Sequence, residues 1–214
     1  MKIRTILLSL ALLALAPEAR AQQPQPPAPA GARWDVSGQL ALLNRNKTDL
    51  GSRWDHWYAA PVVEGSAGHY WTPHLKTELE IATAGQGTID SVEDAFVPGS
   101  TFPSQRYRAH KLRETTVGAT AVYQFFDNQW VHAFLGAGVE VARERHLADS
   151  LPALRPFQAV PAIDRTSYSV RPVVSGGFKF YVNERVFVRT EVRTALSTRR
   201  PLAIQWRGGV GFDF

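Results

Sequence analysis

The sequence contains no cysteine, which excludes a disulfide framework, a thiolate metal site, a cysteine nucleophile and a lipid-anchored N-terminal cysteine. After the first 21 residues, no run approaches the roughly 18 apolar residues that a membrane-spanning helix needs. Charge of one sign is also scarce. The 24 Lys and Arg exceed the 19 Asp and Glu by a net charge of +5, but the two signs are interspersed and no nucleic-acid-binding signature is present. These absences exclude several common classes of exported and nucleic-acid-binding protein.

The N-terminus has the pattern of a targeting segment. Residues 1–21 open with Lys2 and Arg4, continue with a short apolar run and end in Ala-Arg-Ala, a small-x-small cleavage pattern. Residues 22–33 are rich in Pro and Ala, favour extended polyproline II and cannot build a core. We therefore expect a signal peptide at 1–21, a Pro-rich periplasmic lead-in at 22–33 and an exported folded domain at 34–214.

That domain shows strand-length segments of alternating polarity and almost no helical periodicity. Alternation with a period of two predicts strands at residues 34–43, 56–71, 75–84, 112–126, 130–143, 166–182, 186–196 and 203–214. Short connections (72–74, 127–129 and 183–185) alternate with longer ones (44–55, 85–111, 144–165 and 197–203). Short turns at one end and long loops at the other are typical of a membrane-spanning barrel, and the strands are long enough to cross.

The segment 203–214 shows the alternation of apolar and polar residues most clearly. Trp206, Gly208, Val210, Phe212 and Phe214 share one parity, and polar or small residues occupy the other. A membrane-spanning sheet tolerates no open edge, so this segment should pair with residues 34–43 and close the barrel. We predict an all-β, eight-stranded antiparallel up-and-down transmembrane β-barrel. A soluble barrel with its apolar parity inside would show the same periodicity, so the side chains must distinguish the two.

Aromatic residues gather at the ends of the predicted strands. One group lies beside the short turns or the terminus, and a second lies toward the long loops: Trp34, Trp71, Phe125, Phe126, Trp130, Phe180, Phe212 and Phe214, then Trp54, Trp57, Tyr58, Tyr168 and Trp206. Ordinary cross-strand pairing of aromatics would not sort them to the ends. We interpret the two groups as the aromatic girdles of a membrane barrel.

The polar parity carries equal numbers of acidic and basic residues. They are Glu64, Lys76, Glu78, Glu80, Glu114, Glu140, Arg171, Lys179, Arg189, Glu191, Arg193 and Arg207. Most acids fall in the first predicted strands and most bases in the last, so a closed ring would set an acidic wall against a basic wall. Buried charges persist only when paired. We expect a lumen closed by a salt-bridge network, with Gly136, Gly138, Gly177, Gly209 and Gly211 leaving room for long side chains. An open sheet facing water remains the alternative.

Two prolines conflict with this scheme. Pro61 and Pro172 lie inside predicted strands, where each removes a ladder donor, so we expect bulges or strand ends there.

The signal peptide, the eight strands, the tight turns and the terminal Gly208 to Phe214 segment resemble the small outer-membrane β-barrel superfamily, that is, the OmpA transmembrane-domain and OmpX/OmpW-like proteins. The resemblance covers residues 34–214 and implies outer-membrane localisation. It also implies that Val210, Phe212 and Phe214 form the signal read by the barrel-assembly machinery. The peptidoglycan-binding domain of full OmpA proteins has no counterpart, so wall anchoring is not implied.

The sequence gives no catalytic, metal-binding or cofactor motif. The lipid A deacylases, which are barrel enzymes, would require a Ser two residues after a His, and none of the six histidines has one. A set assembled from distant strands stays open. His69 and His74 flank a turn without a third ligand, and His132 suits a hydrogen-bonded lumen residue.

The predicted loop 85–111 is the segment most suited to a partner. It contains both basic and aromatic residues: Phe96, Phe102, Arg106, Tyr107, Arg108 and Lys111. The bases could contact lipopolysaccharide phosphates and the aromatic residues a partner surface, although a solvated loop would have the same composition.

Our primary hypothesis is a non-enzymatic, monomeric integral outer-membrane protein with a structural or surface-interaction role, in contact with outer-membrane lipids and lipopolysaccharide and with no nucleic-acid partner. The alternatives are a small OmpW-like channel or conduit for hydrophobic solutes, and a lipid A-modifying hydrolase.

Overall fold

A computed structural model describes residues 33–46, 57–95, 99, 101, 104–126, 130–153, 157–196 and 201–214. The predicted signal peptide and almost all of the lead-in lie outside these residues. The described part contains no helix long and apolar enough to cross a membrane. Its strands are β1 (Trp34–Asn46), β2 (Trp57–Tyr70), β3 (Leu75–Ala84), β4 (Gly87–Ala95), β5 (Ser104–Phe125), β6 (Val131–Ala148), β7 (Ile163–Tyr181), β8 (Val186–Leu196) and β9 (Pro201–Asp213).

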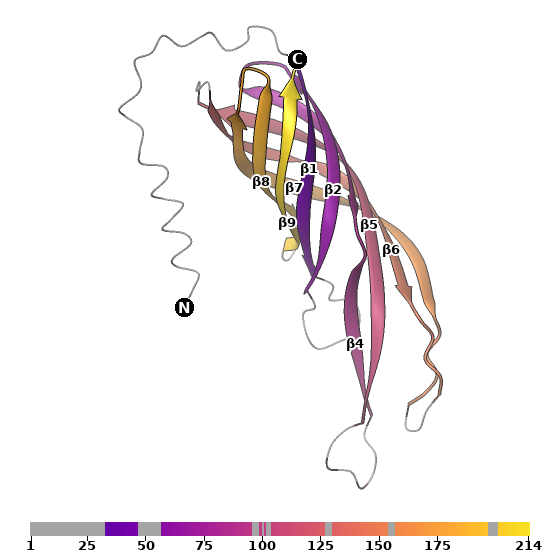
Figure 1. Ribbon diagram of the computed structural model, residues 1–214. Coiled ribbons are helices and arrows are strands. Elements are labelled where there is room, and N and C mark those ends of the chain that lie inside the picture. The colour runs from indigo at the N-terminus through magenta and orange to yellow at the C-terminus, as the bar shows by residue number, and fades with distance from the viewer. Residues whose placement is uncertain are drawn as a thin grey trace. The chain divides into compact units, whose positions relative to one another are not determined.

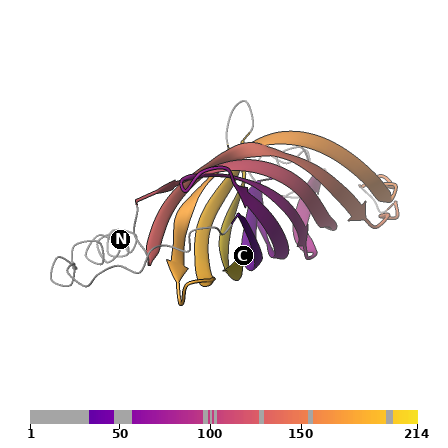
Figure 2. The same cartoon turned by 90° about the horizontal axis from the view of Figure 1, so that it is seen from above.

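The sheet closes into a ring. Its strands follow the order β3-β2-β1-β9-β8-β7-β6-β5-β4, every pairing is antiparallel, and an additional β3–β5 pairing joins the two sides (Figure 1). Eight strands, all except β4, therefore form the ring, and the curvature of the sheet is visible from above in Figure 2. This confirms the predicted eight-stranded up-and-down architecture, including the closure of β9 on β1 from Asp213 to Ala203.

The prediction of a loop at 85–111 is wrong. After a break at Gly85 and Gln86 the chain continues as β4, which pairs with the first part of β5 just as β3 pairs with the second part. Gly85 donates its backbone N–H to the Pro61 carbonyl at 2.7 Å, so the chain stays bonded to the sheet through the break. The predicted strand 112–126 therefore starts at Ser104.

The two strands that follow are also longer than predicted, because β6 continues to Ala148 and β7 begins at Ile163. We call the part of the sheet formed by β4 and the adjoining ends of β5, β6 and β7 the extension (Figure 1).

Exposure alternates along most of the strands as predicted, whereas residues 164–170 of β7 are exposed on both parities. In β3 every second residue is buried, and the exposed set is Leu75, Thr77, Leu79, Ile81 and Thr83. Large exposed apolar residues occur around the ring, for example Leu40, Val63, Leu135, Val170 and Val210. The apolar parity thus faces outward and the polar parity inward, which is the membrane-barrel arrangement rather than that of a soluble barrel.

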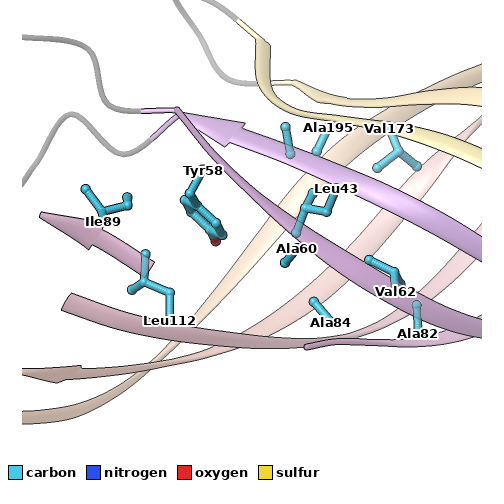
Figure 3. Close-up of a cluster of buried hydrophobic side chains, with 11 residues drawn as sticks. Leu43, Tyr58, Ala60, Val62, Ala82, Ala84, Ile89, Leu112, Val173 and Ala195 are labelled. Carbon is cyan, nitrogen blue, oxygen red and sulfur yellow. The ribbon is translucent and has the colours of Figure 1, made fainter. Parts of the chain in front are cut away.

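One buried apolar cluster lies inside, toward the ends of the strands that lead to the long connections. Figure 3 shows Leu43, Tyr58, Ala60, Val62, Ala82, Ala84, Ile89, Leu112, Val173 and Ala195, and Ala203 completes the cluster. Tyr58 is only 6 % exposed, so its assignment to the outer girdle is wrong. It shares the inward parity of Ala60 and Val62, and parity decides its direction.

Pro61 and Pro172 lie inside β2 and β7, so the predicted bulges or strand ends are absent, but each lies next to the end of the ladder with one neighbouring strand. The β2–β3 ladder stops at Val62, one residue beyond Pro61, and the β7–β8 ladder starts at Val173, one residue beyond Pro172. Each proline still pairs on its other side, with Leu42 and Val139 respectively. Since a missing N–H costs nothing where no partner strand is present, both residues are accommodated without a bulge.

Candidate functional site

The barrel interior is the candidate site, because alternate positions of all eight ring strands project charged side chains into it. All twelve charged residues of the polar parity are buried. Further buried charges that the sequence did not single out are Asp35, Arg45, Glu144 and Asp213. We describe their contacts from the short-turn end of the ring to the long-loop end.

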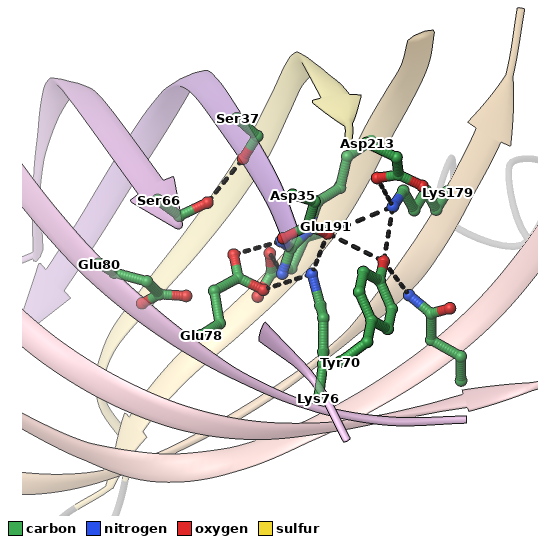
Figure 4. Close-up of polar contacts among 12 residues, drawn as sticks. Asp35, Ser37, Ser66, Tyr70, Lys76, Glu78, Glu80, Lys179, Glu191 and Asp213 are labelled. Atoms are coloured by element: carbon green, nitrogen blue, oxygen red, sulfur yellow. Dashed lines mark hydrogen bonds and ion pairs between the residues drawn. The ribbon is translucent and has the colours of Figure 1, made fainter. Parts of the chain in front are cut away.

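A lysine and two aspartates meet near the short turns. The Lys179 ammonium lies 2.7 Å from Asp213 and 3.2 Å from Asp35, and 2.8 Å from the Tyr70 hydroxyl (Figure 4). Asp35 also contacts Lys76 at 2.6 Å. The charged residues of this cluster come from β1, β3, β7 and β9. The cluster therefore links strands on both sides of the β1–β9 pairing that closes the ring.

The next level connects opposite walls. Glu78 of β3 lies 2.5 Å from Arg189 of β8 and 2.9 Å from Lys76, and Arg189 also contacts Glu191 at 2.8 Å. Since β3 and β8 are four strands apart around the eight-stranded ring, the Glu78–Arg189 pair spans the lumen. An Arg–carboxylate pair of this kind is a strong, charge-assisted interaction.

Two arginines form ion pairs in the middle of the barrel. Arg193 contacts Glu80 on the opposite wall and Glu140 of β6 at 2.9 Å. Arg207 contacts Glu64 of β2 at 2.8 Å, two strands away around the ring rather than on the opposite wall. Its guanidinium also donates to the side-chain oxygen of Gln205 at 2.8 and 3.0 Å.

The outermost charged level lies among the residues of the apolar cluster, since Arg45 follows Leu43 on β1 and Arg171 precedes Val173 on β7. Arg171 contacts Glu114 and Glu140, both at 2.7 Å. Arg45 contacts Glu114 and, at 2.7 Å, Glu144 of β6 on the opposite wall. The predicted strands ended at residue 43 and at residue 143, which is why Arg45 and Glu144 were missed; extending the alternation by two residues would have found both.

Two phenylalanines share the interior with the charges. The Lys179 ammonium lies 3.7 Å from the ring centre of Phe187, and the Arg189 guanidinium lies 4.6 Å from that of Phe134. Both rings stand on the inward parity, and cation–π contacts add to the ion pairs of these two bases.

The five glycines that we expected to leave room for long charged side chains do not do so. An added Cβ would first meet neighbouring backbone at Gly138, Gly177 and Gly209, and an uncharged side chain at Gly136 and Gly211. A Cβ on Gly177 would lie 2.0 Å from the Thr190 carbonyl oxygen of β8. A Cβ on Gly209 would lie 2.2 Å from the Gly38 carbonyl oxygen of β1. These glycines permit the close approach of adjacent strands in a strongly curved sheet.

The three histidines considered from the sequence contact aromatic rings or backbone. His69 packs between Trp34 and Trp71, with ring centres 4.4 and 4.7 Å away, and the His74 Nδ1 lies 3.1 Å from the Gln124 carbonyl. His132 packs edge-on against Tyr181. Among the described residues, no group of three or more His, Cys, Asp or Glu could hold a metal ion.

Two of the three bases predicted to face a partner instead bind the β6–β7 connection. Arg106 donates to the carbonyls of Pro152 and Gln158 at 2.8 and 2.9 Å. Arg108 donates to those of Asp149 and Pro161 at 3.0 and 2.6 Å. They fasten this connection to the extension, whereas Lys111 is exposed on the opposite face.

Comparison with known proteins agrees with this architecture. Neisserial surface protein A superposes with a TM-score of 0.55 at 16% sequence identity, covering 85% of this chain and 97% of that chain. The outer membrane protein OprG from Pseudomonas aeruginosa superposes with a TM-score of 0.50 at 11% identity, covering 86% and 96% respectively. No protein-family model matches the chain, and neither does any curated protein sequence. The chain therefore has the fold of the small eight-stranded outer-membrane β-barrels, the superfamily that its sequence resembles.

Proposed function

We propose that this chain is an integral outer-membrane β-barrel with a structural or surface-interaction role, whose interior is closed by paired charges. The observation that carries the proposal is that ion pairs cross from wall to wall, with Glu78–Arg189 linking β3 to β8 and Arg45–Glu144 linking β1 to β6. An eight-stranded ring is just wide enough for side chains to fill it. The buried apolar cluster near the long connections adds to this barrier to ions.

The balance of signs supports a closed interior over a conducting one. Selective pores are lined by rings of charge of one sign or by backbone carbonyls. Among the described residues, every buried carboxylate lies within 4 Å of a buried ammonium or guanidinium. A base held between two acids, as Arg171 is between Glu114 and Glu140, binds no passing anion.

Planar-bilayer recording tests the closed interior. We expect the purified protein to insert without stable single-channel steps. A variant with Glu78→Ala and Arg189→Ala removes one cross-lumen pair and serves as a control that the recording detects an opened barrel. Stable steps from the unaltered protein would overturn this proposal and favour the channel alternative.

Fractionation tests the location. The protein should be recovered in the outer-membrane fraction and should migrate faster on gels before heating than after it, because a folded barrel resists detergent. Recovery as a soluble periplasmic protein would contradict the proposal.

We further propose that phosphate-bearing lipids of the outer leaflet, lipopolysaccharide in particular, contact the outer face of β5 and β6. Val117 and Val141 pair at the edge of the apolar belt, and the rungs above them carry exposed arginines, Arg143 and then Arg113 opposite Arg145. Like charges directly opposite one another repel. Asp164 holds Arg145 at 2.9 Å, and a lipid phosphate would offset the charge of the other two.

Vesicle binding tests this lipid contact. Replacing Arg113 and Arg143 with Gln should weaken the association of the reconstituted barrel with lipopolysaccharide relative to a neutral phospholipid. Arg185→Gln, in the exposed turn at the other end of the barrel, is the matched control and should have no effect. Equal loss in both variants would show a nonspecific charge effect and refute the assignment.

The resemblance to small outer-membrane barrels supports a role for Val210, Phe212 and Phe214 in assembly. All three are exposed on the outward parity at the end of β9. Replacing Phe212 and Phe214 with Ser should lower the yield of folded barrel in cells more than the yield of refolding in detergent. An equal loss in both settings would assign these residues to stability rather than to recognition by the assembly machinery.

A further inference from the structure

Three strands of the extension bring a serine and two histidines together on one face. His110 of β5 pairs with Ile89 of β4, two residue pairs along the ladder from the Ser91–Arg108 pair, so Ser91 lies diagonal to His110 on the same face. On the other side of β5, His110 is likewise diagonal to His146 of β6, which pairs with Leu112. The row Ser91–His110–His146 therefore crosses β4, β5 and β6.

The distances in this row are those of a hydrogen-bond chain. The Ser91 Oγ lies 2.7 Å from the His110 Nε2, and the His110 Nδ1 lies 2.9 Å from the His146 Nε2. Two imidazole nitrogens at this distance need one proton between them. If His110 donates that proton from Nδ1, its Nε2 is bare and can accept the proton of the Ser91 hydroxyl.

That tautomer reproduces the roles of a nucleophile, a general base and an orienting group. In hydrolytic triads the third residue holds the base in the correct tautomer and stabilises its protonated form, and the arrangement is defined by geometry rather than by order in the chain. His146 takes the third role here. His110 is buried, whereas Ser91 and His146 are partly exposed, so the nucleophile at one end of the row is reachable while the base is shielded from water.

We propose that Ser91 is an activated nucleophile, with His110 as its general base and His146 as a positioning residue, and that the site acts on carboxylic esters with an apolar acyl group. Ile89 and Leu112, both buried, flank the row on the side of the apolar cluster and match an acyl chain.

The proposed reaction balances within these groups. The Ser91 Oγ attacks the ester carbonyl carbon while its proton passes to the His110 Nε2. The carbon–oxygen bond of the leaving alcohol then breaks, and the alcohol takes that proton. Water, deprotonated by His110, hydrolyses the acyl-serine and restores the free hydroxyl. This activity goes beyond the role proposed for the barrel, for which we expected no catalytic residue.

An organophosphorus probe tests the nucleophile without knowledge of the natural ester. In the folded, reconstituted protein, a fluorophosphonate should form an Oγ–phosphorus bond at Ser91 as fluoride leaves and the proton passes to His110. Peptide mass spectrometry should locate the adduct at Ser91 and not at Ser37, whose hydroxyl bonds Ser66 at 2.7 Å and no histidine. Ser37→Ala should label as the unaltered protein does, and Ser91→Ala should not label.

The histidine variants separate activation from simple hydrogen bonding. His110→Gln should slow labelling by about 10²–10⁴-fold, the usual contribution of a general base. His146→Gln should slow it less and shift the pH at which the labelling rate is half-maximal. Heat-modifiable gel mobility shows that each variant is folded. Labelling of Ser91 at the same rate in folded His110→Gln, or no labelling of the unaltered protein at any pH, would overturn the proposal.

Discussion

Replacing Glu78 with Gln is the sharpest test of the interior ion pairs. Glu78 is completely buried and lies within 3 Å of two cations, Arg189 at 2.5 Å and Lys76 at 2.9 Å. Glutamine has the same shape but no charge, so the substitution removes the ionic contribution with little change in packing. The two cations then remain buried with less compensation, which is the costly situation for an ion pair.

The contacts that Arg189 and Lys76 retain set the expected loss in the free energy of unfolding. Breaking a buried pair costs about 3–5 kcal/mol when a charge is left without a partner. Here Arg189 keeps Glu191 at 2.8 Å and Lys76 keeps Asp35 at 2.6 Å, so we expect the lower end of that range. A loss of about 3 kcal/mol corresponds to roughly two powers of ten in the folding equilibrium constant, at about 1.4 kcal/mol per factor of ten.

Urea titration of the barrel in lipid vesicles, followed by heat-modifiable gel mobility, measures this loss. The matched control is Asp164→Asn, which breaks the exposed Arg145–Asp164 pair of the extension. Exposed pairs contribute little, so the control should show no measurable change. The double variant Glu78→Gln, Arg189→Gln should lose less than the sum of the two single losses. A Glu78→Gln variant within about 0.5 kcal/mol of the unaltered protein would refute the stabilising role of the cross-lumen pair.

Three further outcomes follow from the geometry. Gly209→Ala should destabilise the barrel by about 1–3 kcal/mol, because its Cβ would meet the β1 backbone at 2.2 Å, whereas the adjacent Gly208→Ala, with nothing within 4 Å, should be tolerated in the same urea titration. Leu112→Ala should cost about 2–5 kcal/mol in that assay, since it empties a fully buried site in the apolar cluster. The hydrogen bond from Arg145 lowers the pKa of Asp164, so carbon-13 titration should show a depressed pKa that returns to its ordinary value in Arg145→Gln.

The ring could be predicted from the sequence because a period of two is a local property. The alternation within each strand shows which residues face inward and which face outward. The order of short and long connections then shows which strands are antiparallel neighbours. The same reasoning failed at β4, where Asp90, Ser91 and other polar residues follow a Gly-Gln-Gly break and hide the alternation. Tyr58 was assigned to the outer girdle because it is aromatic, although its position in the alternation places it on the inward face.

The partners within the interior could not be predicted from the sequence. Glu78 and Arg189 are 111 residues apart, and only the shear of the closed ring decides which levels of opposite walls meet. Ser91 and His110 are 19 residues apart, so a search for a serine two residues after a histidine does not find them. They meet because β4 pairs with β5 in one particular register.

The charged residues of the interior also affect the unfolded chain, because they prevent single strands from inserting into a membrane as helices. The strands β5, β6 and β7 are 22, 18 and 19 residues long, lengths at which a continuous apolar segment would cross a bilayer as a helix. Lining the interior with apolar residues would give each strand a longer continuous apolar stretch, since the outward face of the ring below Arg113 and Arg143 is already apolar. Glu114, Glu140 and Arg171 interrupt one strand each near the middle, where a charge opposes insertion as a helix most strongly. The cost of burying them is offset only when the ring has closed and Arg171 lies 2.7 Å from both glutamates. An interior of paired charges therefore keeps each strand too polar to enter a membrane alone, while the closed ring is stable within one.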